Sequence, residues 1–206
     1  MRIYSIKPLF QKFLSPVKDL LIRLNIHPTT INLLALIISI TGGLALYFSY
    51  QNTILLLWIP FMAFIRTAFN ALDGLIAREL KVKNQQFGEV LNEFIDRLSD
   101  VAIFLGLAFA PYINLQLASA AIVLILLNSY LGIAGKAAGG KRQYAGIMGK
   151  ADRMFYLSVA AIAVLITNNL NIMNYLLGFI AITTIISLFQ RFFAIKKELY
   201  KPTGKK

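Results

Sequence analysis

Three long stretches of this sequence contain no charged residue. Residues 24–65, 101–135 and 154–190 carry no Asp, Glu, Lys or Arg, and together they make up more than half of the 206 residues. A helix of a water-soluble domain needs a polar face toward solvent, so charge-free runs of this length are not compatible with a soluble fold. We therefore interpret the chain as an integral membrane protein.

Each charge-free stretch is long enough for nearly two membrane-spanning helices, which need about 20 residues each. Each stretch also contains a short polar interruption near its middle, at residues 50–53, 111–114 and 168–171. These features predict an all-α fold, a six-helix membrane bundle built from three hairpins. The predicted helices cover residues 31–49, 53–80, 88–110, 114–136, 151–167 and 172–195.

The 21 Lys and Arg residues mark one side of this bundle. They gather in the N-terminal segment, in the second and fourth connections and at the C-terminus, whereas the three polar turns contain none. By the positive-inside rule we expect both termini in the cytoplasm and a multi-pass protein of the inner membrane. Because the cations flank apolar spans, the net charge of +12 indicates membrane lipids and no nucleic acid as a partner.

The first 28 residues differ from the rest, which we treat as one membrane domain of residues 29–206. Cations alternate there with apolar residues at helical spacing, namely Phe10, Leu14, Val17, Leu21 and Leu24. This pattern predicts an amphipathic helix in the cytoplasmic interface, bent at Pro16. A solvated basic leader is the alternative interpretation.

Six of the nine acidic residues fall between Asp73 and Asp100. The helix lengths place Asp96 and Asp100 within the membrane on its cytoplasmic side, and Asp73 at the inner boundary of the preceding helix. A charge costs about 2.5–3.5 kcal/mol near the bilayer centre and less near its edge. Several such charges together predict a polar cavity between helices.

The polar residues share one face on each of two consecutive helices. The first face carries Arg66, Asn70, Asp73 and Ala77, and the second carries Glu89, Asn92, Asp96 and Asp100. A short connection predicts antiparallel neighbours whose oxygen-rich faces meet, which favours a hard divalent cation, Mg²⁺ or Mn²⁺. The single histidine, His27, argues against a zinc site. Intramembrane ion pairs, such as Arg66–Asp73 and Arg97–Asp100, are the structural alternative.

Small residues accompany the first acidic face. Gly74 and Ala77 would let a ligand approach the helix closely, and Arg78 beside a metal ion would suit a diphosphate. Close helix packing by small residues is the competing explanation.

These residues form a motif. Asn70-Ala-Leu-Asp73-Gly74-Leu-Ile-Ala77-Arg78, followed by Gly88, Asn92 and Asp96, resembles the signature of the CDP-alcohol phosphotransferases, also called CDP-alcohol phosphatidyltransferases. That signature reads D-x-x-D-G-x-x-A-R, then G-x-x-x-D-x-x-x-D after about eight residues. Here the first and third acidic positions are asparagines, and the spacer has nine residues. The resemblance extends over the whole chain.

The resemblance implies a reaction dependent on Mg²⁺ or Mn²⁺, in which an alcohol attacks a CDP-linked lipid, usually CDP-diacylglycerol, and CMP leaves. It also implies a homodimer. It assigns metal binding to Asn70, Asp73, Asn92 and Asp96, general-base catalysis to Asp96, and contacts with CDP to Asp73, Gly74, Ala77, Arg78 and Gly88. The two amides predict weaker metal binding or a single ion, and Asp100, one turn beyond Asp96, is a further candidate ligand.

The glycine-rich, basic segment 136–153 lies on the same predicted side of the membrane. It is the candidate site for an anionic acceptor, such as glycerol 3-phosphate or inositol phosphate, with Lys141, Arg142, Lys150 and Arg153 as the binding residues. Attraction to anionic lipid is the alternative, most of all for Lys141 and Arg142.

We therefore predict a transferase of phospholipid synthesis. One alternative is a catalytically weakened homologue with a lipid-binding or regulatory role. Another is a small cation transporter that uses Asp73, Asp96 and Asp100. The outer halves of the helices offer no ionisable residue to continue such a path.

Overall fold

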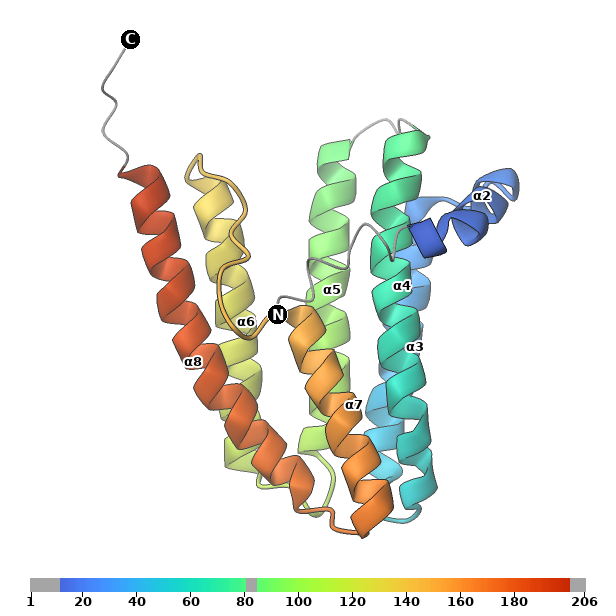
Figure 1. Ribbon diagram of the computed structural model, residues 1–206, viewed down its shortest axis with the longest axis vertical. Coiled ribbons are helices and arrows are strands. Elements are labelled where there is room, and N and C mark those ends of the chain that lie inside the picture. The colour runs from blue at the N-terminus through green and yellow to red at the C-terminus, as the bar shows by residue number, and fades with distance from the viewer. Residues whose placement is uncertain (1–11, 81–84, 201–206) are drawn as a thin grey trace.

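The computed structural model describes residues 12–80 and 85–200, and every regular element in these two ranges is helical. Six long helices run side by side along the molecule, and a short helix, α2, projects at an angle from the side of the bundle near one end (Figure 1). The all-α prediction is confirmed. The elements are α2 (Ser15–Arg23), α3 (Pro28–Phe48), the 3₁₀-helix η2 (Thr53–Leu57), α4 (Trp58–Glu79), α5 (Gln85–Ala108), α6 (Leu115–Ala137), α7 (Lys150–Thr167) and α8 (Ile172–Leu199).

Helices α3 to α8 occupy the six predicted segments. The segment 53–80 is divided, because η2 precedes α4. Asn52 caps η2 by accepting a hydrogen bond from the backbone N–H of Ile54 at 3.0 Å. Helix α8 continues past the predicted end at residue 195. Lys196 and Lys197 lie in its last turn, where cations interact favourably with the helix dipole.

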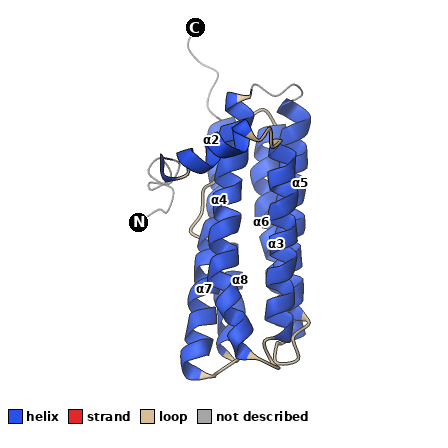
Figure 2. Cartoon of the chain, turned by 90° about the vertical axis from the view of Figure 1, so that its right-hand side faces the viewer, coloured by secondary structure: helices blue, strands red, loops and turns tan. Residues whose placement is uncertain are grey.

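Four segments are long and apolar enough to cross a membrane: Pro28–Phe48, Thr53–Glu79, Leu115–Ala137 and Ile172–Leu199. The chain is therefore a multi-pass membrane protein. Helices α5 and α7 lie among these segments in the bundle (Figures 1 and 2). Charges extend from Glu89 to Asp100 in α5 and from Lys150 to Arg153 in α7, and neither helix is among the four. That α5 and α7 also cross the membrane stays a prediction.

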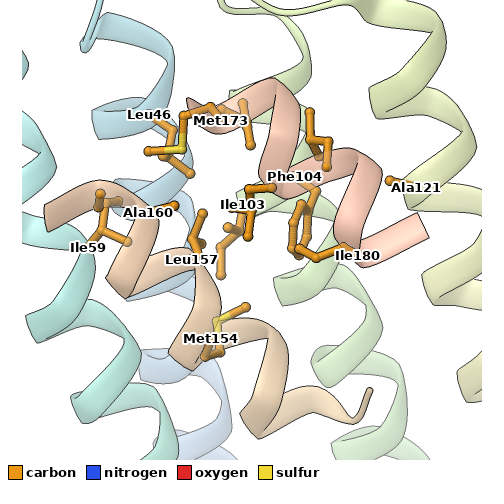
Figure 3. Close-up of a cluster of buried hydrophobic side chains, with 14 of the residues drawn as sticks. Leu46, Ile59, Ile103, Phe104, Ala121, Met154, Leu157, Ala160, Met173 and Ile180 are labelled. Carbon is orange, nitrogen blue, oxygen red and sulfur yellow. The ribbon is translucent and has the colours of Figure 1, made fainter. Parts of the chain in front are cut away.

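One large apolar cluster holds the six long helices together (Figure 3). Each helix contributes fully buried side chains, including Leu46, Ile59, Phe104, Ala121, Leu157 and Met173. The polar residues of the predicted site lie toward the end of the bundle where α4 ends and α5 begins.

Helix α3 packs against both α4 and α5, whereas α4 and α5 make few contacts with each other. The polar faces of the two motif-bearing helices meet through side chains, because Arg66 of α4 contacts Asp96 and Asp100 of α5. The α3–α5 contact is close because both helices have a glycine there. A Cβ atom on Gly43 would collide with the backbone of Ala102, and one on Gly106 would collide with the backbone of Gly43.

Helix α2 begins at Ser15 with Pro16 in its first turn, and the helical residues 12 and 13 precede it across a turn at Leu14, so the helical path is interrupted next to Pro16. The predicted apolar stripe is divided. Leu14 and Leu21 pack against an apolar cluster of α3 and α4, whereas Val17 and Leu24 are exposed. Phe10 lies outside the described residues, and the interfacial position of α2 stays a prediction.

Candidate functional site

Asp73 lies on the buried face of α4 and is only 5% exposed. Its Oδ1 accepts a hydrogen bond from the backbone N–H of Gly74 at 2.6 Å. The side chain of Asn32, on α3, is a further hydrogen-bond partner. Asn70 lies one turn earlier on α4 and is partly buried. A carboxylate at this depth requires polar partners, which Gly74 and Asn32 supply.

The surface beside Asp73 is open. A Cβ atom on Gly74 would meet only Nη2 of Arg78, at 3.8 Å, and one on Gly88 would meet nothing within 4 Å. Arg78 is exposed, and its Nε donates to the carbonyl oxygen of Gly74 at 3.0 Å. Ala77 is partly buried. The predicted CDP-binding positions thus border open space where α4 ends and α5 begins.

On α5, Asn92 and Asp96 lie one turn apart. The Oδ1 atom of Asn92 is buried without a hydrogen-bond partner among the described residues. Asp96 is partly buried, and its Oδ2 lies 3.6 Å from Nη2 of Arg97. A buried amide oxygen that binds nothing is unfavourable, so the Oδ1 atom of Asn92 is a candidate ligand atom.

The motif residues of α4 and α5 form one electrostatic unit. The carboxylates of Asp73 and Asp96 are close enough for their charges to interact, and the charge of Lys150 acts on Asp73 as well. The guanidinium of Arg66 bonds to the backbone of α5, with Nη2 3.2 Å from the carbonyl oxygen of Asp96. Residues from α4, α5 and the start of α7 therefore meet at this end of the bundle.

Asp100 is bound by two arginines from two other helices. Arg66 on α4 donates to Oδ1 at 2.7 Å, and Arg153 on α7 donates to Oδ2 at 2.8 Å. All three residues are at most 2% exposed. The predicted alternative pairs, Arg66–Asp73 and Arg97–Asp100, are replaced by Arg66–Asp100 and Arg97–Asp96.

The acidic face of α5 is matched by cations from residues 136–153. Lys136 pairs with Glu89, Arg142 with Glu93, Lys150 with Asp96, and Arg153 with Asp100. We call these four pairs the charge ladder. Arg142 also lies over the ring of Tyr144, with 4.8 Å between Cζ and the ring centroid. Sequence analysis predicted the acidic face of α5 and the basic segment 136–153, but it did not predict that they bind each other.

Helix α8 anchors the connection between α6 and α7. The backbone N–H of Met148 donates to Ser187 Oγ at 2.8 Å, and Arg191 Nε donates to the carbonyl oxygen of Ala145 at 3.1 Å. Farther along, the carboxylate of Glu198 accepts from the backbone N–H of Lys141 at 2.8 Å. These anchors were missed by sequence analysis. Their only signal was a polar stripe on α8, and its direction depends on helix rotation.

The predicted acceptor residues fall into two groups. Arg142, Lys150 and Arg153 belong to the charge ladder, whereas the side chain of Lys141 is exposed outside it. A bound anionic acceptor would therefore have to share or displace the acidic partners of the first group.

The chemistry of the donor set fits a hard divalent cation only with the help of amides. No group of three or more carboxylate, histidine or cysteine side chains that could hold a metal ion occurs within residues 12–80 and 85–200. Two of the four motif positions are asparagines, and amide oxygens are ligands for such cations. The unpartnered Oδ1 of Asn92 fits this role. Both oxygens of Asp100 are bonded to arginines, and its role as an additional ligand stays a prediction.

Comparison with known proteins identifies a family. Residues 25–189 match the profile of CDP-alcohol phosphatidyltransferase. Inner membrane protein YnbA of Escherichia coli strain K12 is 39% identical over 168 residues, which cover 81% of this chain and 82% of that protein. Archaetidylinositol phosphate synthase of Pyrococcus horikoshii is 28% identical over 195 residues, which cover 95% and 97% of the two chains.

The fold is shared with a solved structure, phosphatidylinositol phosphate synthase of Mycobacterium tuberculosis with CDP-DAG bound. The TM-score is 0.73 at 21% identity, and the match covers 95% of this chain and 99% of that one. The same synthase has also been solved in complex with manganese and citrate, with a TM-score of 0.71 at 21% identity and coverage of 93% and 92%.

Proposed function

This chain belongs to the CDP-alcohol phosphatidyltransferase family, and on that premise we propose which reaction it carries out. It transfers the phosphatidyl group of CDP-diacylglycerol, or of a similar CDP-alcohol, to an alcohol acceptor and releases CMP. The observation that most supports this proposal is the meeting of the two halves of the motif. Asp73 on α4 and Asp96 on α5 interact at one end of the bundle, beside the open positions at Gly74 and Gly88.

In this proposal Asn70, Asp73, Asn92 and Asp96 bind Mg²⁺ or Mn²⁺. When bound, such an ion polarises the diphosphate and stabilises the charge on the departing CMP. Asp73, Gly74, Ala77, Arg78 and Gly88 bind the CDP part of the donor. The exposed guanidinium of Arg78 suits a phosphate group, because its planar fork forms paired hydrogen bonds with phosphate oxygens.

Asp96 is the general base. The acceptor hydroxyl oxygen attacks the lipid-side phosphorus, the bond from that phosphorus to the bridging oxygen of CMP breaks, and the hydroxyl proton moves to Asp96. A partly buried carboxylate at the cytoplasmic edge of the bundle is accessible to a water-soluble alcohol and to a lipid donor from the side. Lys150 and Arg97 orient this carboxylate.

The acceptor is a phosphorylated polyol, such as glycerol 3-phosphate or inositol phosphate. Lys141, Arg142, Lys150 and Arg153 bind its phosphate group. Two arguments support this choice. The connection before α7 is anchored to α8 and its cations pair with the acidic face of α5, and the Pyrococcus horikoshii relative is named archaetidylinositol phosphate synthase.

The proposal includes a membrane arrangement. Helices α5 and α7 also cross the membrane, which gives six spans, and both termini are cytoplasmic in the inner membrane. Helix α2 lies in the cytoplasmic interface, and the protein is a homodimer. The distribution of Lys and Arg supports this orientation, and the E. coli relative is named as an inner membrane protein.

A catalytically weakened, lipid-binding homologue is the second candidate. The two asparagines at motif positions 70 and 92 favour it, because they remove two of the four carboxylates that the family signature supplies. Weaker metal binding would lower the rate without abolishing binding of the donor.

The test is CMP release from CDP-diacylglycerol by the purified protein with Mg²⁺ or Mn²⁺, across a panel of polyol phosphates. We expect release with at least one acceptor and its loss in Asp96→Asn. The matched control is Asp19→Asn, which removes an exposed carboxylate on α2 and should leave the rate unchanged. Absence of CMP with every acceptor, together with retained binding of CDP-diacylglycerol, would support the weakened homologue and exclude the transferase.

A further inference from the structure

The charge balance of the metal-binding positions differs from that of the family signature. The signature has four acidic positions, whereas this chain has two carboxylates, Asp73 and Asp96, and two neutral amides, Asn70 and Asn92. A site with half the negative charge cannot neutralise the same number of divalent cations. Something else must set how many ions it binds.

A cation of the protein lies at these carboxylates. The ammonium group of Lys150 pairs with Oδ1 of Asp96, and its charge also acts on Asp73. Arg97 is farther from Asp96, with 3.6 Å between Nη2 and Oδ2. Lys150 therefore contacts Asp96 more closely than Arg97 does.

The position of Lys150 is held by its surroundings. It is the first residue of α7, and the N-terminus of this helix is capped by a hydrogen bond from the Gly149 backbone N–H to Asp152 Oδ2 at 2.8 Å. One turn later, Arg153 is bonded to the buried Asp100. Lys150 therefore lies at a helix N-terminus that is fixed by the Gly149–Asp152 hydrogen bond and by the Arg153–Asp100 pair.

From this geometry we propose that the Lys150 ammonium takes the place of one divalent cation, so that the site binds one metal ion per chain. The inference rests on the proposed function. Two carboxylates with one divalent ion and one ammonium come close to neutrality. Two divalent ions beside Lys150 would leave a strong excess of positive charge before any donor binds. Asn92 fits the single ion, because its buried Oδ1 is unpartnered.

Binding of Mn²⁺ to purified protein, followed by electron paramagnetic resonance of the free ion, tests the inference without a catalytic readout. We expect one Mn²⁺ per chain in the unmodified protein. Lys150→Met should raise the affinity at least tenfold, because it removes the competing charge. Lys150→Arg should keep the affinity within about threefold. Lys136→Met is the matched control, since it removes the exposed ladder cation of Glu89 and should change the affinity less than twofold.

The amides give a second, independent measurement. The triple variant Asn70→Asp, Asn92→Asp and Lys150→Met should bind a second Mn²⁺. The double variant that keeps Lys150 should bind the second Mn²⁺ more weakly. Two bound ions or none in the unmodified protein would overturn the inference. It would also be overturned if Lys150→Met, with normal thermal stability, bound Mn²⁺ with an unchanged or lower affinity. Failure of CMP release with the expected Mn²⁺ binding would instead reject only the proposed function.

Discussion

Arg66 and Asp100 form a buried ion pair that joins α4 to α5, with 2.7 Å between Nη2 and Oδ1 and each side chain only 1% exposed. The second oxygen of Asp100 binds Arg153 of α7. Because α4 and α5 make few direct contacts, this pair is a principal link between the two helices that carry the motif.

Asp100→Asn should destabilise the fold by about 3–5 kcal/mol, because it leaves two buried guanidinium groups without a counter-charge. Thermal unfolding in detergent measures this effect. Asp19→Asn, at an exposed position, is the control and should have little effect. Because the carboxylate of Asp100 is bonded to two buried arginines, the number of Mn²⁺ ions bound should not change in Asp100→Asn. A loss of bound metal in a stable variant would contradict this description.

Gly43→Ala should destabilise the α3–α5 contact by about 1–3 kcal/mol, because the added methyl group collides with backbone atoms that cannot move independently. Gly178→Ala in α8 is the matched control, since nothing lies within 4 Å of the added atom. The control should be neutral or slightly stabilising. Equal unfolding temperatures for the two variants would show that the helices approach less closely than described.

Ser187→Ala should loosen the connection between α6 and α7. It leaves the buried backbone N–H of Met148 without its acceptor, at a cost of about 1–3 kcal/mol. We expect a several-fold higher KM for the polyol phosphate and an unchanged KM for the CDP-lipid, measured by CMP release. Thr183→Ala removes a hydroxyl group that bonds only within its own helix, and it serves as the control. An equal rise in both KM values would argue against a specific effect on the acceptor.

Tyr112 makes the stability of the protein fall at high pH. Burial raises the pKa of its hydroxyl, against a smaller opposite effect of the hydrogen bond with Ser49, at 2.7 Å. The folded state therefore favours the protonated form. This stabilisation is present below the unfolded pKa of about 10 and declines as pH rises toward the folded pKa. Between pH 8 and pH 11 the unfolding temperature should fall less for Tyr112→Phe than for the unmodified protein. An equal fall in both would contradict the prediction.

Much of the fold could be predicted because the signals are local. Charge-free runs broken by Asn and Pro placed the six long helices within a few residues, although η2 and the extension of α8 were not foreseen. The motif itself located Asp73 and Asp96 in one site. Whether these residues act as proposed depends on measurements of activity and metal binding.

What sequence determined was the composition of the site: which charged residues it contains, on which helix faces they lie, and that two amides stand in place of carboxylates. Only the tertiary structure decided the partners. Arg66 binds Asp100 and not Asp73, α3 packs against both motif helices, and Lys150 pairs with Asp96. Hydropathy and helical spacing depend on neighbouring residues along the chain. An ion pair depends on how each helix is rotated. It also depends on the path of the connection between α6 and α7, which is bonded to α8, a segment distant in the sequence.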